Sequence, residues 1–239
     1  MTIDTIDDSQ RKAARAVGFS YLLAIPPALF AGVYVFSQLI VRNNVAETAL
    51  NIIAHERLFR LGIAINLFSF VVDVVLITAL YVVLKPVNRG LALFATFVRL
   101  IETALLVVVT LNEFDVLRVL SGAEYLRVFE ANRLHAFANV SLGAYSAGYN
   151  VGLMLAGLGS TVFCYLWFKS DYIPRLLAML GVFSSIVLAT CTFAFIIAPE
   201  LAGAVTLGYY GGPIFVFEVT MGLWLTLKGL KPAVASSRR

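Results

Sequence analysis

The sequence contains six long runs of apolar residues, separated by short polar segments. A helix needs about 20 apolar residues to cross a hydrocarbon core of about 30 Å, and a helix satisfies its own backbone hydrogen bonds in lipid. The runs therefore predict an all-α fold, a polytopic membrane bundle of six transmembrane helices. The expected spans are residues 17–41, 61–84, 91–111, 143–168, 174–197 and 209–227.

The composition excludes a soluble fold for these runs. Of the 239 residues, 60% are hydrophobic and 13% are charged, whereas a soluble domain is about half apolar and about a quarter charged. We therefore expect one integral membrane domain over residues 1–239, with the lipid bilayer as its partner. The net charge of +4 does not indicate nucleic-acid binding, because Lys and Arg occur singly or in small groups between the runs. The sequence does not indicate the oligomeric state.

The fourth run predicts an unusually long helix. Its helical periodicity extends back from the clear span at 143–168 to Ala131. A helix from Ala131 to Phe168 would be about 57 Å long at 1.5 Å per residue, which exceeds the bilayer core. We expect its first part to project outward from the membrane, and a first part lying at the interface is the alternative.

The distribution of Lys and Arg predicts the orientation of the six spans. Cytoplasmic flanks of membrane proteins carry an excess of these residues. With both termini on the cytoplasmic side, eleven of them lie there: Arg11, Lys12, Arg15, Lys85, Arg89, Lys169, Arg175, Lys228, Lys231, Arg238 and Arg239. Six lie on the other side: Arg42, Arg57, Arg60, Arg118, Arg127 and Arg133. Tyr81, Trp167 and Trp224 precede lysines on the first side, as interfacial aromatic anchors do.

Four ionisable residues lie deep in the expected spans, where an unpaired charge costs at least about 2.5–3.5 kcal/mol. Asp73, Arg99, Glu102 and Glu218 are each within a few residues of the middle of a span. The matching depth predicts one polar cluster formed by the second, third and sixth spans. Three carboxylates and one guanidinium leave an excess of two negative charges, so either a carboxylate holds a proton or a cation binds there.

Helical spacing adds detail to this cluster. Arg99 and Glu102 are three residues apart and form a pair on one helix face. Asn66 lies seven residues before Asp73, on the same face, and is a further candidate to bind a ligand or ion. Polar groups of this kind also hold helices together without any other function.

Tandem prolines interrupt the first span. Pro26 and Pro27 lack the N–H groups that would bond to the carbonyls of Leu22 and Leu23, so we expect a kink there that supports the polar site. Free carbonyls next to buried charges are typical of transporter sites, although a kink that serves only packing is the alternative.

The sequence shows no motif for a metal site, a cofactor or catalysis. Cys164 and Cys191 lie in separate apolar runs, and neither has a His at metal-ligand spacing. His55 and His135 are interpreted as solvated residues. No nucleophile and base pair is visible, so enzymatic activity is not predicted.

Several short patterns are distinctive in combination: RKAARAVGFSYLLAI, ERLFRLGIA, ALYVVLKPVNRGLAL, LSGAEYLRVF, FKSDYIPRLLAMLG and LWLTLKGLK. From Arg11 to Lys231 the chain resembles a bacterial family of multi-span membrane proteins catalogued as a domain of unknown function. The resemblance implies a location in the bacterial cytoplasmic membrane and a single domain. It implies no activity, substrate or catalytic residue.

Three functions remain open from the sequence. The first is a transporter or binding protein for a small solute, an ion or protons. In it Asp73 titrates or meets a cation, Arg99 is the counter-charge, Glu102 is the partner of Arg99, and Glu218 is the contribution of the last span. The second is a structural or partner-binding membrane protein whose buried charges only lock the bundle. The third is an intramembrane enzyme or a lipid-binding sensor.

Overall fold

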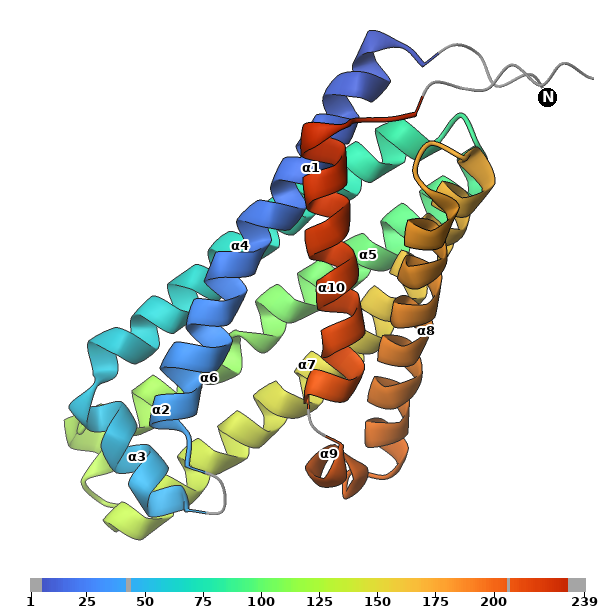
Figure 1. Cartoon of the computed structure of the whole chain (residues 1–239). Coiled ribbons are helices and arrows are strands. Elements are labelled where there is room, and N and C mark those ends of the chain that lie inside the picture. The colour runs from blue at the N-terminus through green and yellow to red at the C-terminus, as the bar shows by residue number, and fades with distance from the viewer. Residues whose placement is uncertain (1–5, 42–43, 206, 232–239) are drawn as a thin grey trace, which may run out of the picture. The chain divides into compact units, whose positions relative to one another are not determined.

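The computed structural model describes residues 6–41, 44–205 and 207–231, and within these ranges the chain is helical without a strand (Figure 1). This confirms the all-α prediction. The α-helices are α1 Asp8–Leu29, α2 Ser37–Leu39, α3 Val45–Ala54, α4 Glu56–Leu84, α5 Arg89–Val109, α6 Leu111–Val119, α7 Ala131–Ser170, α8 Arg175–Ile197, α9 Leu201–Ala204 and α10 Leu207–Leu227. A π-helix, η1, covers Phe30–Phe36, and a 3-10 turn, η2, covers Glu124–Leu126.

Six stretches of helix in the described residues are long and apolar enough to cross a membrane, as predicted. Two of them exceed the expected spans at both ends: Arg89–Val119 and Ala131–Ser170. Another, Glu56–Leu84, begins five residues before the expected span and ends at the same residue. The third stretch is longer because α6 follows α5 after a single residue, Thr110. The fourth, α7, has 40 residues and a length of about 60 Å at 1.5 Å per residue. The predicted long fourth helix is confirmed.

Side chains of the loops define where several helices begin. Asn44 caps α3, because its side-chain oxygen accepts a hydrogen bond from the backbone N–H of Glu47 at 3.0 Å. Asn88 plays the same part before α5 and accepts from the N–H of Leu91 at 3.0 Å. Between α7 and α8, Asp171 takes a positive φ of 54°, which few residues other than glycine, Asn and Asp adopt readily.

Both prolines of the first span lie inside α1, and the chain changes from α- to π-helix after Leu29. Turns of π-helix often occur at functional sites. The predicted kink stays a prediction.

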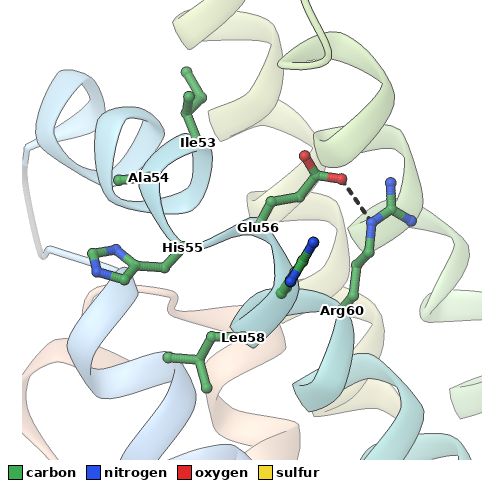
Figure 2. A pocket seen from close by; sticks show the side chains of 7 residues that line it. Ile53, Ala54, His55, Glu56, Leu58 and Arg60 are labelled. Atoms are coloured by element: carbon green, nitrogen blue, oxygen red, sulfur yellow. Dashed lines mark hydrogen bonds and ion pairs between the residues drawn. The ribbon is translucent and has the colours of Figure 1, made fainter.

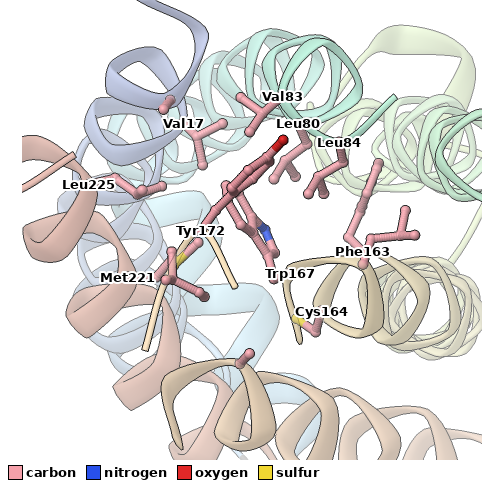
Figure 3. Close-up of a cluster of buried hydrophobic side chains, with 14 of the residues drawn as sticks. Val17, Leu80, Val83, Leu84, Phe163, Cys164, Trp167, Tyr172, Met221 and Leu225 are labelled. Carbon is pink, nitrogen blue, oxygen red and sulfur yellow. The ribbon is translucent and has the colours of Figure 1, made fainter. Parts of the chain in front are cut away.

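The chain divides into two compact units, and the first comprises Met1–Leu23, Val72–Thr103 and Asn150–Arg239. Its core contains the fully buried side chains of Trp167, Tyr172 and Phe217. Figure 3 shows the rings of Trp167 and Tyr172 among aliphatic side chains that include Val17 and Leu84. The N–H of Lys231 donates to the carbonyl of Tyr172 at 2.8 Å and so holds the residues after α10 against the loop before α8.

The second unit comprises Ala24–Val71 and Ala104–Tyr149. Its smaller core joins residues of η1, α2, α3, α4, α6 and α7: Val35, Leu39, Ile52, Phe59, Ile63, Val116, Leu117 and Ala138. The rings of Phe36 and Phe59 meet edge to face, with 5.9 Å between centroids. Gly62 lets η1 approach α4, because a Cβ built on it would lie 3.0 Å from Cγ1 of Val35.

Candidate functional site

Arg99 lies at the centre of a buried charged cluster in the first unit. Its Nη1 is 3.2 Å from Oε2 of Glu102, and its Nη2 is 3.9 Å from Oδ1 of Asp73. The side chains of Glu102, Arg99 and Asp73 are 3%, 12% and 23% exposed, respectively. The contact with Glu102 joins residues three apart on α5, and the contact with Asp73 joins α5 to α4.

Glu218 belongs to the same cluster by electrostatic interaction. It lies near the middle of α10, is partly buried, and interacts electrostatically with Asp73, Arg99 and Glu102. No ion pair within 4.0 Å reaches it from any residue that the structure describes. The four charged residues singled out from the sequence thus lie in one region of the first unit, and only three are joined by direct ion pairs.

A glycine on the neighbouring α7 makes room for the side chain of Arg99. A Cβ built on Gly159 would lie 2.7 Å from Cγ of Arg99, 3.1 Å from its Cδ and 3.3 Å from the carbonyl oxygen of Ala95. On α5, the hydroxyl of Thr103 donates to the carbonyl of Arg99 at 2.9 Å and lies 3.5 Å from Oε2 of Glu102. The aliphatic part of the Arg99 side chain therefore packs against α7, and its guanidinium contacts the two carboxylates.

Tyr21 is a member of this cluster that the sequence did not single out. Its side chain lies on α1, is 9% exposed, and interacts electrostatically with Glu218, Arg99 and Asp73. Its ring meets that of Phe217, the residue before Glu218, edge to face at 6.1 Å. The sequence has ten tyrosines. An uncharged tyrosine is not unusual in an apolar run, unlike Asp, Glu or Arg, so nothing in the sequence distinguishes Tyr21 from the others.

The remaining candidate residues from the sequence lie in the second unit. The amide of Asn66 donates a hydrogen bond to the hydroxyl of Tyr145 on α7 at 3.5 Å. Pro26 and Pro27 fall in the part of α1 that belongs to this unit. The charged cluster of the first unit therefore consists of Asp73, Arg99, Glu102 and Glu218, with Tyr21 added.

A shallow recess lies where α3 meets α4 in the second unit (Figure 2). Glu56 accepts a hydrogen bond from Arg60 at 2.7 Å, and His55 points away from this pair. These side chains are exposed to solvent, as expected for loop residues. Among the residues that the structure describes, no three His, Cys, Asp or Glu side chains meet in a way that could hold a metal ion.

The charged cluster has a composition that favours a positively charged ligand. When all its groups are ionised, Asp73, Glu102 and Glu218 carry three negative charges against the one positive charge of Arg99. Carboxylates next to one another repel, and removal from water makes each of them costlier to keep ionised. A proton or a small cation bound among them would reduce this imbalance.

The comparisons with known proteins give a family and no activity. The model of the family described as "Domain of unknown function (DUF4386)" matches residues 16–229, which is most of the chain. No curated protein and no solved structure matches the chain. The six apolar helices agree with an integral membrane protein. The chain belongs to the DUF4386 family.

Proposed function

We propose that this protein binds protons or a small cation at the charged cluster and moves them across the membrane. The observation that carries the proposal is that three buried or partly buried carboxylates lie around a single guanidinium. Arg99 contacts Glu102 at 3.2 Å and Asp73 at 3.9 Å, and interacts with Glu218 only at longer range. A cation in this cluster would gain the attraction of the carboxylates that Arg99 does not neutralise.

Each charged residue has a distinct part in the proposal. Glu102 is the local partner of Arg99, because the two form the shorter contact within one helix. Asp73 is the carboxylate that titrates or meets the cation, because it is the farther from Arg99 and its side chain is the more exposed, at 23% against 3%. Glu218 brings α10 into the site, so that a change in its charge would act on a third helix.

We also propose that the protein lies in the cytoplasmic membrane with both termini in the cytoplasm. The excess of Lys and Arg on that side supports this orientation. Three interfacial cation–π contacts support it as well: Lys228 lies 4.7 Å and Lys231 6.0 Å from the ring centroid of Trp224, and Lys169 lies 5.7 Å from that of Tyr165. Single cysteines placed at residues 12 and 118 should react with a membrane-impermeant thiol reagent from opposite sides.

The alternative function is a structural one, in which the charges only hold the bundle together. The direct contact between Arg99 and Glu102 and the close fit of Arg99 against Gly159 favour this alternative. It explains why these two charges are buried, but it does not need Asp73 or Glu218. The two functions therefore differ in what they predict for these two carboxylates.

The test is a flux measurement on the purified protein in liposomes. A pH-sensitive dye or a cation indicator inside the vesicles reports transport by the wild type, by Asp73→Asn and by Glu218→Gln. Glu200→Gln is the control, because Glu200 is exposed in the turn before α9. We expect both cluster variants to fold and to lose flux, while the control keeps it. If the wild type shows no flux, or if both variants only unfold, the structural alternative is right. If both variants keep wild-type flux, the charged cluster is not the site of transport.

A further inference from the structure

Glu113, in α6 of the second unit, is a buried acid that the sequence did not single out. The residue is 1% exposed. Both of its carboxyl oxygens are buried, and neither has a hydrogen-bond partner among the described residues. An ionised carboxylate without partners in an apolar environment costs several kcal/mol or more, so such groups are normally neutral or paired. This site therefore needs a partner of its own.

The surroundings of Glu113 are mainly apolar. Val116 and Leu117 lie one turn farther along the same face of α6, and both belong to the core of the second unit. Phe59 and Ile63 of α4 belong to the same core. Helices α3, α4 and α7 and the π-helix η1 all contribute apolar side chains, including Ile52, Val35 and Ala138.

The polar groups near Glu113 are few, and none of those described carries a positive charge that could neutralise it. Tyr145 of α7 interacts electrostatically with Glu113, accepts the hydrogen bond of Asn66, and stacks on Tyr149 with 5.8 Å between ring centroids. Among the residues that the structure describes, Tyr145 is thus the titratable group that interacts with Glu113, and Tyr145 interacts in turn with Tyr149. On α6 itself, Arg118 is 71% exposed and pairs with Asp115 at 3.3 Å, so its charge is directed to the surface.

We propose that Glu113 is a second site, a proton-binding site in the second unit. A proton neutralises a carboxylate without a cavity and without further ligands. A metal cation such as Ca²⁺ takes 6–8 oxygen ligands and Mg²⁺ about six, whereas the described groups around Glu113 offer its own carboxyl, a phenol and an amide. The proton is therefore the ligand that fits. The inference does not rest on the proposed function of the charged cluster.

The consequence of this proposal is a stability that depends on pH. The folded protein would hold a proton on Glu113. The unfolded chain releases this proton at pH values above the ordinary pKa of a glutamate, about 4.3. Because the folded state then binds more protons than the unfolded state, stability falls as the pH rises. A tyrosine ordinarily titrates near 10, above this range.

The experiment compares the full-length wild type with Glu113→Gln in detergent, by thermal unfolding from about pH 5 to about pH 9. The amide copies the shape of the neutral acid and has no proton to lose. We expect the melting temperature of the wild type to fall by several degrees more than that of the variant as the pH rises. Asp115→Asn is the matched control, since it changes an exposed, paired carboxylate on the same helix and should follow the wild type.

Parallel curves for the wild type and Glu113→Gln would overturn the proposal. Glu113→Leu provides a second test if the amide disturbs packing, because a neutral acid without partners contributes no hydrogen bond to the fold. We expect Glu113→Leu to fold with a melting temperature near that of the wild type at about pH 5. If neither variant folds, Glu113 is an ionised group with a structural partner, and the proposal is wrong.

Discussion

Three glycines of α7 should respond very differently to alanine. A Cβ on Gly143 would meet nothing within 4 Å. A Cβ on Gly159 would meet Cγ of Arg99 at 2.7 Å, and one on Gly157 would meet the backbone of α8, namely the nitrogen of Ala189 and the carbonyl oxygen of Ser185, both at 2.7 Å. The same Gly→Ala change therefore tests three different surroundings: open space at Gly143, a charged side chain at Gly159 and a helix–helix contact at Gly157.

The magnitudes follow from these distances. In a helix, Gly→Ala alone gains about 0.8–1.0 kcal/mol, so Gly143→Ala should be neutral or slightly stabilising. At Gly159 the contact is about 1 Å shorter than an ordinary carbon–carbon contact, and overpacking of this kind costs about 1–3 kcal/mol. After the gain in helix propensity is subtracted from this cost, Gly159→Ala should lower the free energy of unfolding by about 0–2 kcal/mol. Gly157→Ala must separate two backbones and should lose about 3 kcal/mol or more.

The assay is unfolding in detergent followed by tryptophan fluorescence, because Trp167 is fully buried in the first unit. The expected order of stability is Gly143→Ala, then Gly159→Ala, then Gly157→Ala. The second substitution should also move the guanidinium and so reduce any flux that depends on the charged cluster. Equal stability of Gly143→Ala and Gly159→Ala would refute the close packing of Arg99 against α7.

Two further predictions concern charges. Arg99→Gln should destabilise the protein more than Asp73→Asn, as measured by the same unfolding assay. Arg99→Gln removes the positive charge of the cluster, and loss of one partner of a buried ion pair costs about 3–5 kcal/mol. Asp73→Asn removes one of three carboxylates that share this positive charge. The opposite order of stability would contradict the charge imbalance. In the loop before α8, the guanidinium of Arg175 donates two hydrogen bonds to Asp171 and holds the pKa of that carboxyl below its ordinary value. The Asp171–Arg175 pair should therefore add a small stabilisation at pH values above the ordinary pKa of an aspartate, and this stabilisation should disappear as the pH falls through the lowered pKa. Asp171→Asn should show no such loss in acid unfolding.

The helices and part of the charged cluster could be predicted from the sequence because both depend on short-range spacing. The contact between Arg99 and Glu102 needs only the helical repeat, and the structure has it at 3.2 Å. The position of Tyr21 depends on how α1 packs against other helices, which the repeat does not determine. Asn66 shares a helix with Asp73, but seven residues correspond to about 10 Å along the axis, and the two residues fall in different units.

Glu113 was hidden for a different reason. It follows the third apolar run in a polar segment, and hydropathy alone assigns such a residue to a solvated loop. In the structure the helix resumes as α6 after Thr110, whose hydroxyl donates to the carbonyl of Leu106 at 2.8 Å. The resumed helix turns Glu113 toward the same side as Val116 and Leu117. An ionisable residue at helical spacing from apolar residues is the signal that would have found it.

Glu113 and the charged cluster, taken together, bear on whether the cluster only holds the helices together. Glu113 indicates that this fold buries a carboxyl group without a guanidinium beside it. Arg99, in contrast, keeps its charge at any physiological pH, so once buried it requires at least one carboxylate. Glu102, on the same helix and 3.2 Å away, meets that requirement alone. Asp73 and Glu218 exceed what a lock needs, and this excess is what supports the proposal that the cluster binds exchangeable positive charge.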